Sequence, residues 1–201
     1  MERFNRFSKN IGRVAFALCL YYCPIDAGCQ PVRNELQQVY TSQVGVREAT
    51  GHNDSKEVEK YLRSVGLGKG YAWCAAFVAW SHKEVNIPNP ESAWSPDWFR
   101  SNVVYRADWR KQNITVLPGM VAGIYFPDKK RIAHIFFIDS SDNNNYYTVE
   151  GNTNGAGSRE GDGVYRKIRP KKSVYAIADY CFGTKEFIKQ YHSIIQDATG
   201  H

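Results

Sequence analysis

The chain has 201 residues and contains no internal repeat and no low-complexity tract. It also lacks an apolar stretch long enough to cross a bilayer comfortably, because the clearest apolar run covers only residues 14–23. We therefore expect no transmembrane helix in the mature protein. Apolar residues make up 43% of the chain and charged residues 23%, which is the balance of a soluble globular protein of about one domain.

Cysteine is scarce, and its spacing excludes the common metal sites. None of the five cysteines forms a CxxC pair or a Cys/His cluster with metal-ligand spacing, so we expect neither a metal nor another cofactor. If an export signal removes the first two, Cys29 and Cys181 can pair while a third stays free, but sequence alone leaves that pairing open. The five are Cys19, Cys23, Cys29, Cys74 and Cys181.

A strong excess of one charge is also missing. The net charge is +6, and no cluster of Lys and Arg alternates with aromatic residues, so nucleic acid is not the expected partner. A modest positive charge favours anionic surfaces such as a cell envelope. We expect the protein to act as a monomer.

The N-terminus has the pattern of an export signal. A positively charged start precedes the apolar run at residues 14–23, and Pro24 ends that run. This pattern predicts a signal peptide over residues 1–27, cleaved after Ala27, and places the protein in the periplasm or cell envelope. Lipid attachment at Cys29 and a buried N-terminal helix are the two alternatives.

Predicted helices precede predicted strands along the chain. The helices cover about 34–49, a segment from residue 54, a segment that begins at Cys74, and a short piece at 97–104. The strands cover 120–126, 132–139, 146–150, 164–169 and 174–180. Residues 181–201 are predicted to form an amphipathic C-terminal helical extension. This order predicts an α+β fold in which helices pack on one side of an antiparallel sheet.

Cys74 is the candidate nucleophile. A lone cysteine on an apolar helix is more often a small core residue, but this one is predicted at the very start of its helix. Backbone N–H groups there stabilise a thiolate and a developing oxyanion. His134 lies within an otherwise apolar strand, and the next strand presents Glu150 and Asn152. Antiparallel pairing lets His134 face Glu150, which gives a nucleophile, a base and a group that orients the base.

The sequence around these residues resembles the CHAP family, the cysteine- and histidine-dependent amidohydrolases and peptidases. The resemblance covers about residues 34–180 in the chain order Cys, His, Glu and Asn. It rests on the segments YAWCAAFV at residues 71–78, IAHI at 132–135 and VEGNT at 149–153, with GVREATG at 45–51 before them.

The resemblance implies a papain-like fold and cleavage of amide bonds in peptidoglycan. It makes Cys74 the nucleophile, His134 the general base and then acid, Glu150 the residue that orients His134, and Asn152 an accessory polar residue. The cut is expected at the sugar–peptide amide or within the peptides. Residues 66–73 contain no acidic residue, unlike the family members that bind calcium there, so no calcium is expected.

Three tryptophans are further candidate site residues, and two other functions are alternatives. Trp73, Trp94 and Trp98 are candidates to line a substrate groove beside the nucleophile, with plain core packing as the alternative. A papain-like protease or transferase acting on protein amides would use the same residues. A catalytically inactive wall-binding protein of the same fold is the other alternative.

Overall fold

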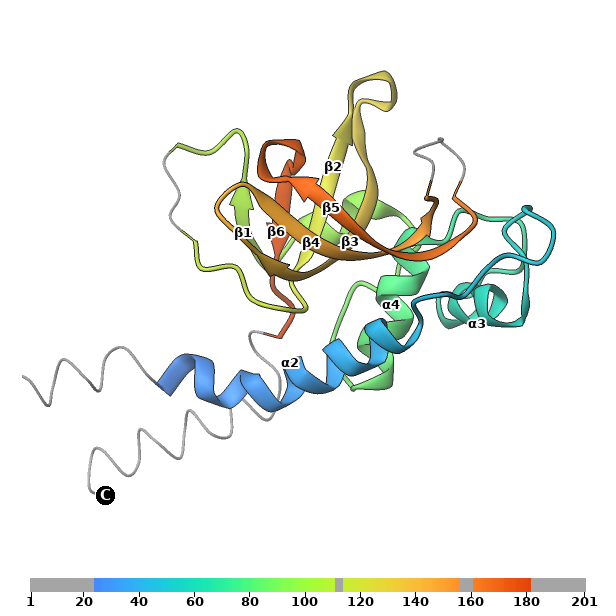
Figure 1. Ribbon diagram of the computed structural model, residues 1–201, viewed down its shortest axis with the longest axis horizontal. Helices are drawn as coiled ribbons and strands as arrows, with labels where there is room; N and C mark the ends of the chain where they lie inside the picture. Colours follow the sequence, from blue (N-terminus) through green and yellow to red (C-terminus); the bar gives the residue numbers. More distant parts are fainter. Residues whose placement is uncertain (1–23, 111–113, 156–160, 182–201) are drawn as a thin grey trace, which may run out of the picture. The chain divides into compact units, whose positions relative to one another are not determined.

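The computed structural model describes residues 24–110, 114–155 and 161–181, without the side chains of 24–29 (Figure 1). Most of the predicted signal peptide and of the C-terminal extension lies outside these residues. The cleavage position predicted after Ala27 falls inside a helix, α2 (Pro24–Ser42). The Cys29 side chain is not described, so its pairing with Cys181 stays a prediction. The following description concerns the compact unit Val32–Phe182.

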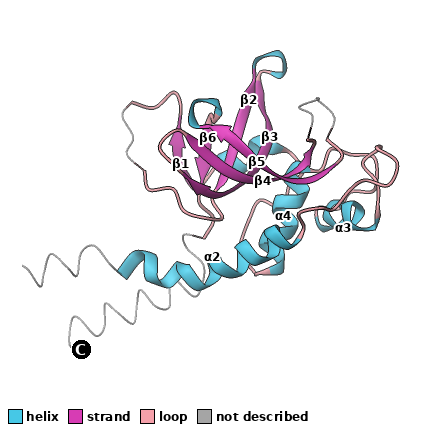
Figure 2. Ribbon diagram, viewed as in Figure 1, coloured by secondary structure: helices cyan, strands magenta, loops and turns pink. Residues whose placement is uncertain are grey.

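Over the residues that the structure describes, the fold is α+β, with three α-helices and a six-stranded antiparallel sheet (Figure 2). The helices α2, α3 (Lys56–Ser64) and α4 (Cys74–Glu84) precede the strands, as predicted. The strand order is β1-β6-β2-β3-β4-β5. The strands are β1 (Val103–Arg106), β2 (Val121–Phe126), β3 (Arg131–Ser141), β4 (Asn145–Thr153), β5 (Gly163–Pro170) and β6 (Ala176–Ala178). In the described part of the chain, no helix combines the length and hydropathy that a bilayer crossing requires.

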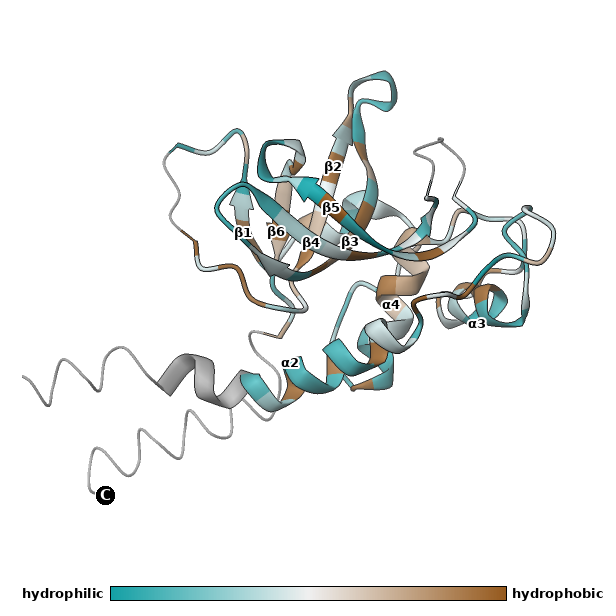
Figure 3. Cartoon of the chain, viewed as in Figure 1, coloured by the Kyte–Doolittle hydropathy of each residue, from teal (hydrophilic) through white to brown (hydrophobic). Residues whose placement is uncertain are grey.

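Helix α4 is the central helix of this unit. Its residues from Cys74 to His82 are all buried, and Figure 3 colours its first turns on the apolar side of the scale. Phe77 of α4 meets Phe137 of β3 edge-on, with ring centroids 5.9 Å apart, and Tyr40 of α2 stacks on the same Phe137 at 4.4 Å. Both helices therefore contact the same strand residue, Phe137.

The other face of the sheet carries a second apolar cluster. It includes Met120, Ala122, Phe136, Ile138 and Ile177. Because side chains alternate along a strand, Phe136 lies on the face opposite to Phe137, and His134 shares the face of Phe136. The ring centroids of His134 and Phe136 are 5.6 Å apart. The histidine thus stands at the edge of an apolar layer.

Two predicted elements were wrong in position. The helix predicted over 34–49 ends at Ser42, because the chain beyond it pairs with the edge of β5: Gly45 donates to the Val164 carbonyl and Arg47 bridges Gly163. The helix predicted over 97–104 is a short 3-10 helix at Ser95–Phe99, followed by β1.

Candidate active site

Cys74 is the first residue of α4, which is the position predicted for the nucleophile. The N–H groups in the first turn of a helix have no intrahelical partner, so they are available to a thiolate or an oxyanion. The hydroxyl of Ser95 lies 3.7 Å from Cys74 Sγ, and the backbone N–H of Ile135 donates to the same sulfur. The Ser95 hydroxyl and the Ile135 N–H therefore lie against a sulfur at the N-terminal end of a helix.

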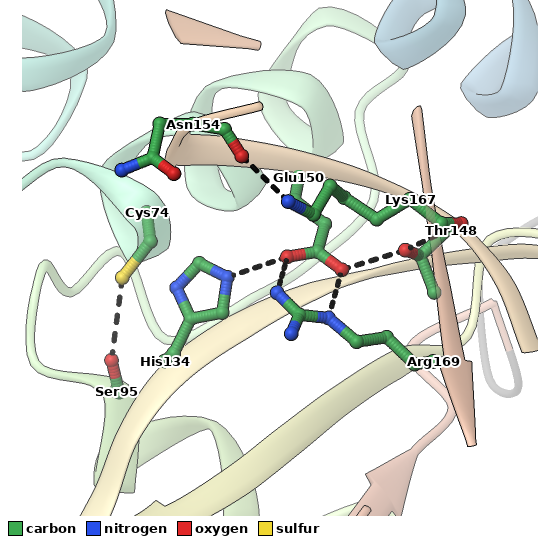
Figure 4. Close-up of polar contacts among 8 residues, drawn as sticks. All are labelled: Cys74, Ser95, His134, Thr148, Glu150, Asn154, Lys167 and Arg169. Atoms are coloured by element: carbon green, nitrogen blue, oxygen red, sulfur yellow. Dashed lines mark hydrogen bonds and ion pairs between the residues drawn. The ribbon is translucent and has the colours of Figure 1, made fainter. Parts of the chain in front are cut away.

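His134 lies between Cys74 and Glu150 (Figure 4). Its Nε2 is 2.9 Å from Glu150 Oε2, and Figure 4 shows its other ring nitrogen on the side of the Cys74 sulfur. With one nitrogen on the carboxylate and the other facing the sulfur, the imidazole has the orientation that a general base needs. The structure brings together three of the residues predicted from the sequence.

Glu150 is completely buried, and the groups that contact its carboxylate in the described part of the chain come from Arg169, Thr148 and His134. Arg169 holds the carboxylate with Nε at 2.8 Å and Nη2 at 2.6 Å, and Thr148 Oγ1 donates at 2.6 Å. His134 supplies the fourth contact. A buried carboxylate with this many donors remains ionised. It can therefore stabilise a positive charge on the imidazole.

The pKa shifts describe a thiolate–imidazolium pair. Burial disfavours the Cys74 thiolate, but the hydrogen bond and charge of His134 outweigh it and lower the thiol pKa to about 7. Burial likewise disfavours the imidazolium, but bonds to Cys74 and Glu150 raise the pKa of His134 to about 9. Burial of Glu150 is outweighed by Arg169 and His134, which lower its pKa to about 2. Near neutral pH the site therefore holds a negative sulfur beside a positive ring.

Asn152 hydrogen-bonds to the backbone of Trp73, the residue that precedes Cys74. Its Oδ1 accepts the N–H of Trp73 at 3.0 Å, and its Nδ2 donates to Asn53 Oδ1 at 3.2 Å. Its φ of 53° is in the left-handed region, where asparagine is favoured over most residues. Gly151 allows Trp73 to approach β4, since an added Cβ would lie 2.8 Å from the Trp73 ring. The Gly-Asn pair thus fixes the start of α4.

The three tryptophans separate into two groups. Trp73 and Trp98 are fully buried, so the prediction that they line a substrate groove is wrong. Their indole N–H groups donate to Glu48 and to the Ser92 carbonyl, and their rings fill the core. Trp94 is 48% exposed and directly precedes Ser95, so it remains a candidate for substrate contact.

Sequence reasoning missed Arg169, Thr148 and Ser95. Thr148 and Glu150 share one face of β4, and an alternating strand pattern reveals that face. Arg169 lies on β5 four residues beyond Tyr165, the residue that pairs with Glu150, so its side chain contacts Glu150 diagonally across the two strands. The sequence does not reveal this register. Ser95 is 21 positions from Cys74 and arrives through an irregular segment.

A cavity of about 320 Å³ opens beside the reactive groups, and Cys74, His134 and Asn152 line it. It provides room for part of a substrate next to the sulfur. Among the described residues, no group of three or more His, Cys, Asp or Glu side chains is arranged to hold a metal ion.

Comparison of the chain with protein-family models, with curated proteins and with solved structures gave no match.

Proposed function

We propose that this protein is a papain-like cysteine amidohydrolase that cleaves amide bonds of peptidoglycan. The observation that carries the proposal is the array in which the Cys74 thiol, the His134 ring and the buried Glu150 carboxylate follow one another. Such an array activates a sulfur nucleophile for acyl transfer. The resemblance of residues 34–180 to the CHAP family supports the papain-like fold and peptidoglycan as the substrate, and the predicted signal over 1–27 supports a place in the envelope.

The proposed reaction has two halves. The Cys74 thiolate attacks the amide carbonyl, and N–H groups at the start of α4 stabilise the resulting oxyanion. The C–N bond then breaks as the His134 imidazolium donates its proton to the leaving nitrogen, which leaves a thioester on Cys74. In the second half, neutral His134 removes a proton from water, the hydroxide attacks the thioester, and the carboxylic acid leaves as the thiolate–imidazolium pair re-forms.

Digestion of purified sacculi tests the proposal. Wild type should release soluble fragments, and mass spectrometry of the new amino and carboxyl termini should identify the amide that is cut. Cys74→Ala should release none. Cys181→Ala is the matched control, because it removes the other described cysteine and leaves the array intact. Cleavage of a protein amide in place of peptidoglycan would favour a protease or transferase, and equal release by Cys74→Ala would exclude the proposed chemistry.

A further inference from the structure

The cavity beside Cys74 is basic. One wall comes from the β2–β3 hairpin and includes Lys129, and another comes from β5 and includes Lys167 and Arg169. Asp128, at the exposed hairpin tip, is the only acidic residue among the described residues that line it. Three cationic side chains therefore face a space that also holds the nucleophile.

These three cations are not equivalent. Arg169 uses Nε and Nη2 on Glu150, so its charge serves the catalytic array. Lys129 is exposed and adjoins Asp128 in sequence. Lys167 is half-buried, and its Nζ donates to the backbone carbonyl of the buried Asn154. Among the residues that the structure describes, Lys167 forms no ion pair, and in Figure 4 no dashed line joins it to the Glu150 carboxylate.

Lys167 thus presents a positioned positive charge that a ligand can neutralise. An ammonium group has three N–H donors, and the Asn154 carbonyl accepts one of them. Hydrogen bonds between an ammonium and a carboxylate are about twice as strong as neutral ones, and partial burial reduces their screening by water. The Asn154 contact limits the motion of the side chain, which lowers the entropy lost on binding.

We propose that Lys167 binds a carboxylate of the substrate, so that the enzyme selects peptides carrying a free carboxylate beside the amide that is cut. This inference rests on the proposed function, and it names the substrate feature that the site recognises. Wall peptides contain both free and amidated carboxyl groups, which differ in charge but hardly in shape. Lys167 therefore distinguishes these two forms.

Alkylation of Cys74 by two small reagents tests the anion site without any hydrolysis. Iodoacetate is anionic and iodoacetamide is its neutral analogue, and both react with the thiolate. Lys167→Met should lower the rate of Cys74 alkylation by iodoacetate about tenfold, equivalent to ~1.4 kcal/mol. The rate with iodoacetamide should change less than about twofold, because the thiolate itself is unaltered. Peptide mass spectrometry assigns the modification to Cys74.

Two variants serve as controls. Lys167→Arg keeps the charge and should keep the preference for iodoacetate. Lys172→Met removes an exposed charge from the short 3-10 helix Lys171–Ser173, which does not line this cavity, and should leave both rates unchanged. Equal loss with both reagents in Lys167→Met, or an equal loss of the iodoacetate rate in Lys172→Met, would overturn the inference.

Peptide cleavage then separates this inference from the proposed function. Wild type should cleave wall peptides with free carboxylates about tenfold faster, in kcat/KM, than their amidated counterparts, and Lys167→Met should remove that difference. Cleavage of both forms at equal rates would refute the carboxylate site and leave the amidohydrolase intact. Cleavage of neither form, with the alkylation preference retained, would refute the amidohydrolase and leave the anion site.

Discussion

Arg169 holds the buried carboxylate of Glu150 through two hydrogen bonds, from Nε at 2.8 Å and from Nη2 at 2.6 Å. The same carboxylate accepts from His134 Nε2. The guanidinium therefore positions Glu150 and, through it, the imidazole. The positive charge of Arg169 also disfavours the protonated form of His134, because both cations contact one carboxylate.

Replacing Arg169 with Gln tests this positioning role. Loss of a partner from a buried ion pair costs about 3–5 kcal/mol, and the partial exposure of Arg169 reduces the expected loss of unfolding free energy to roughly 2–3 kcal/mol. We expect kcat/KM to fall about tenfold to a hundredfold as His134 loses its fixed orientation. Denaturant unfolding and steady-state kinetics measure the two effects.

Arg166→Gln is the matched control for Arg169. Arg166 pairs with Asp139 on the exposed side of β5, so the loss should stay within about 1 kcal/mol and activity should be unchanged. In Arg169→Gln the alkaline limb of the pH–rate profile should also move upward, because a cation near His134 is gone. An unmoved limb with full activity would show that Arg169 serves stability alone.

The pKa values of Cys74 and His134 predict a bell-shaped profile. Activity needs the thiolate, which is lost as the pH falls through about 7. It also needs the imidazolium as proton donor to the leaving nitrogen, and this is lost as the pH rises through about 9. We expect kcat/KM to reach its plateau between these limits.

Ultraviolet absorbance of the thiolate checks the acid limb directly. In wild type, the Cys74 thiolate should appear through about pH 7. In His134→Ala, its pKa should rise well above that value, because burial remains and the stabilising cation is gone. If the thiolate of both proteins titrates at one pH, His134 does not activate Cys74.

Asn152 should act through the start of α4. Asn152→Gly and Asn152→Ala both remove the acceptor for the Trp73 N–H, and we expect both to lose activity to the same degree. Ala must also adopt a φ of 53°, so Asn152→Ala should be less stable than Asn152→Gly by about 1 kcal/mol. Unfolding and kinetics separate the two effects. Wild-type activity in both variants would show that Asn152 has no role in activity.

Truncation of Trp98 should affect stability, whereas truncation of Trp94 should affect substrate binding. Trp98→Ala removes a fully buried ring, so we expect about 3–5 kcal/mol of lost stability. Trp94→Ala removes an exposed ring and should leave the unfolding free energy within about 0.5 kcal/mol while KM rises several-fold. An unchanged KM in Trp94→Ala would exclude that residue from substrate binding.

The difference between these tryptophans shows what the sequence could and could not predict. Residue type makes Trp73, Trp94 and Trp98 all suitable for a groove, but burial depends on tertiary contacts such as the packing of Tyr180 against the Trp98 ring. Strand alternation was enough to bring His134 and Glu150 onto one face. The sequence pattern was also enough to place Cys74 at the first position of its helix.

The parts that were missed depend on tertiary contacts. The helix ends at Ser42 because the following residues hydrogen-bond to the backbone of β5. No local sequence pattern predicts these partners. Arg169 reaches Glu150 diagonally across the β4–β5 register, and that register includes an irregularity between Glu150 and Thr153. Local patterns therefore located Cys74, His134 and Glu150 better than the groups that hold them.

The most direct test of the account is to trap the acyl-enzyme. A reaction of wild type with peptidoglycan fragments is quenched in acid, and the peptide that contains Cys74 is weighed by mass spectrometry. We expect a thioester adduct whose added mass equals the acyl half of the fragment, and none in Cys74→Ala. Hydrolysis by Cys74→Ala at the wild-type rate, with no adduct on the wild-type cysteine, would contradict nucleophilic attack by Cys74.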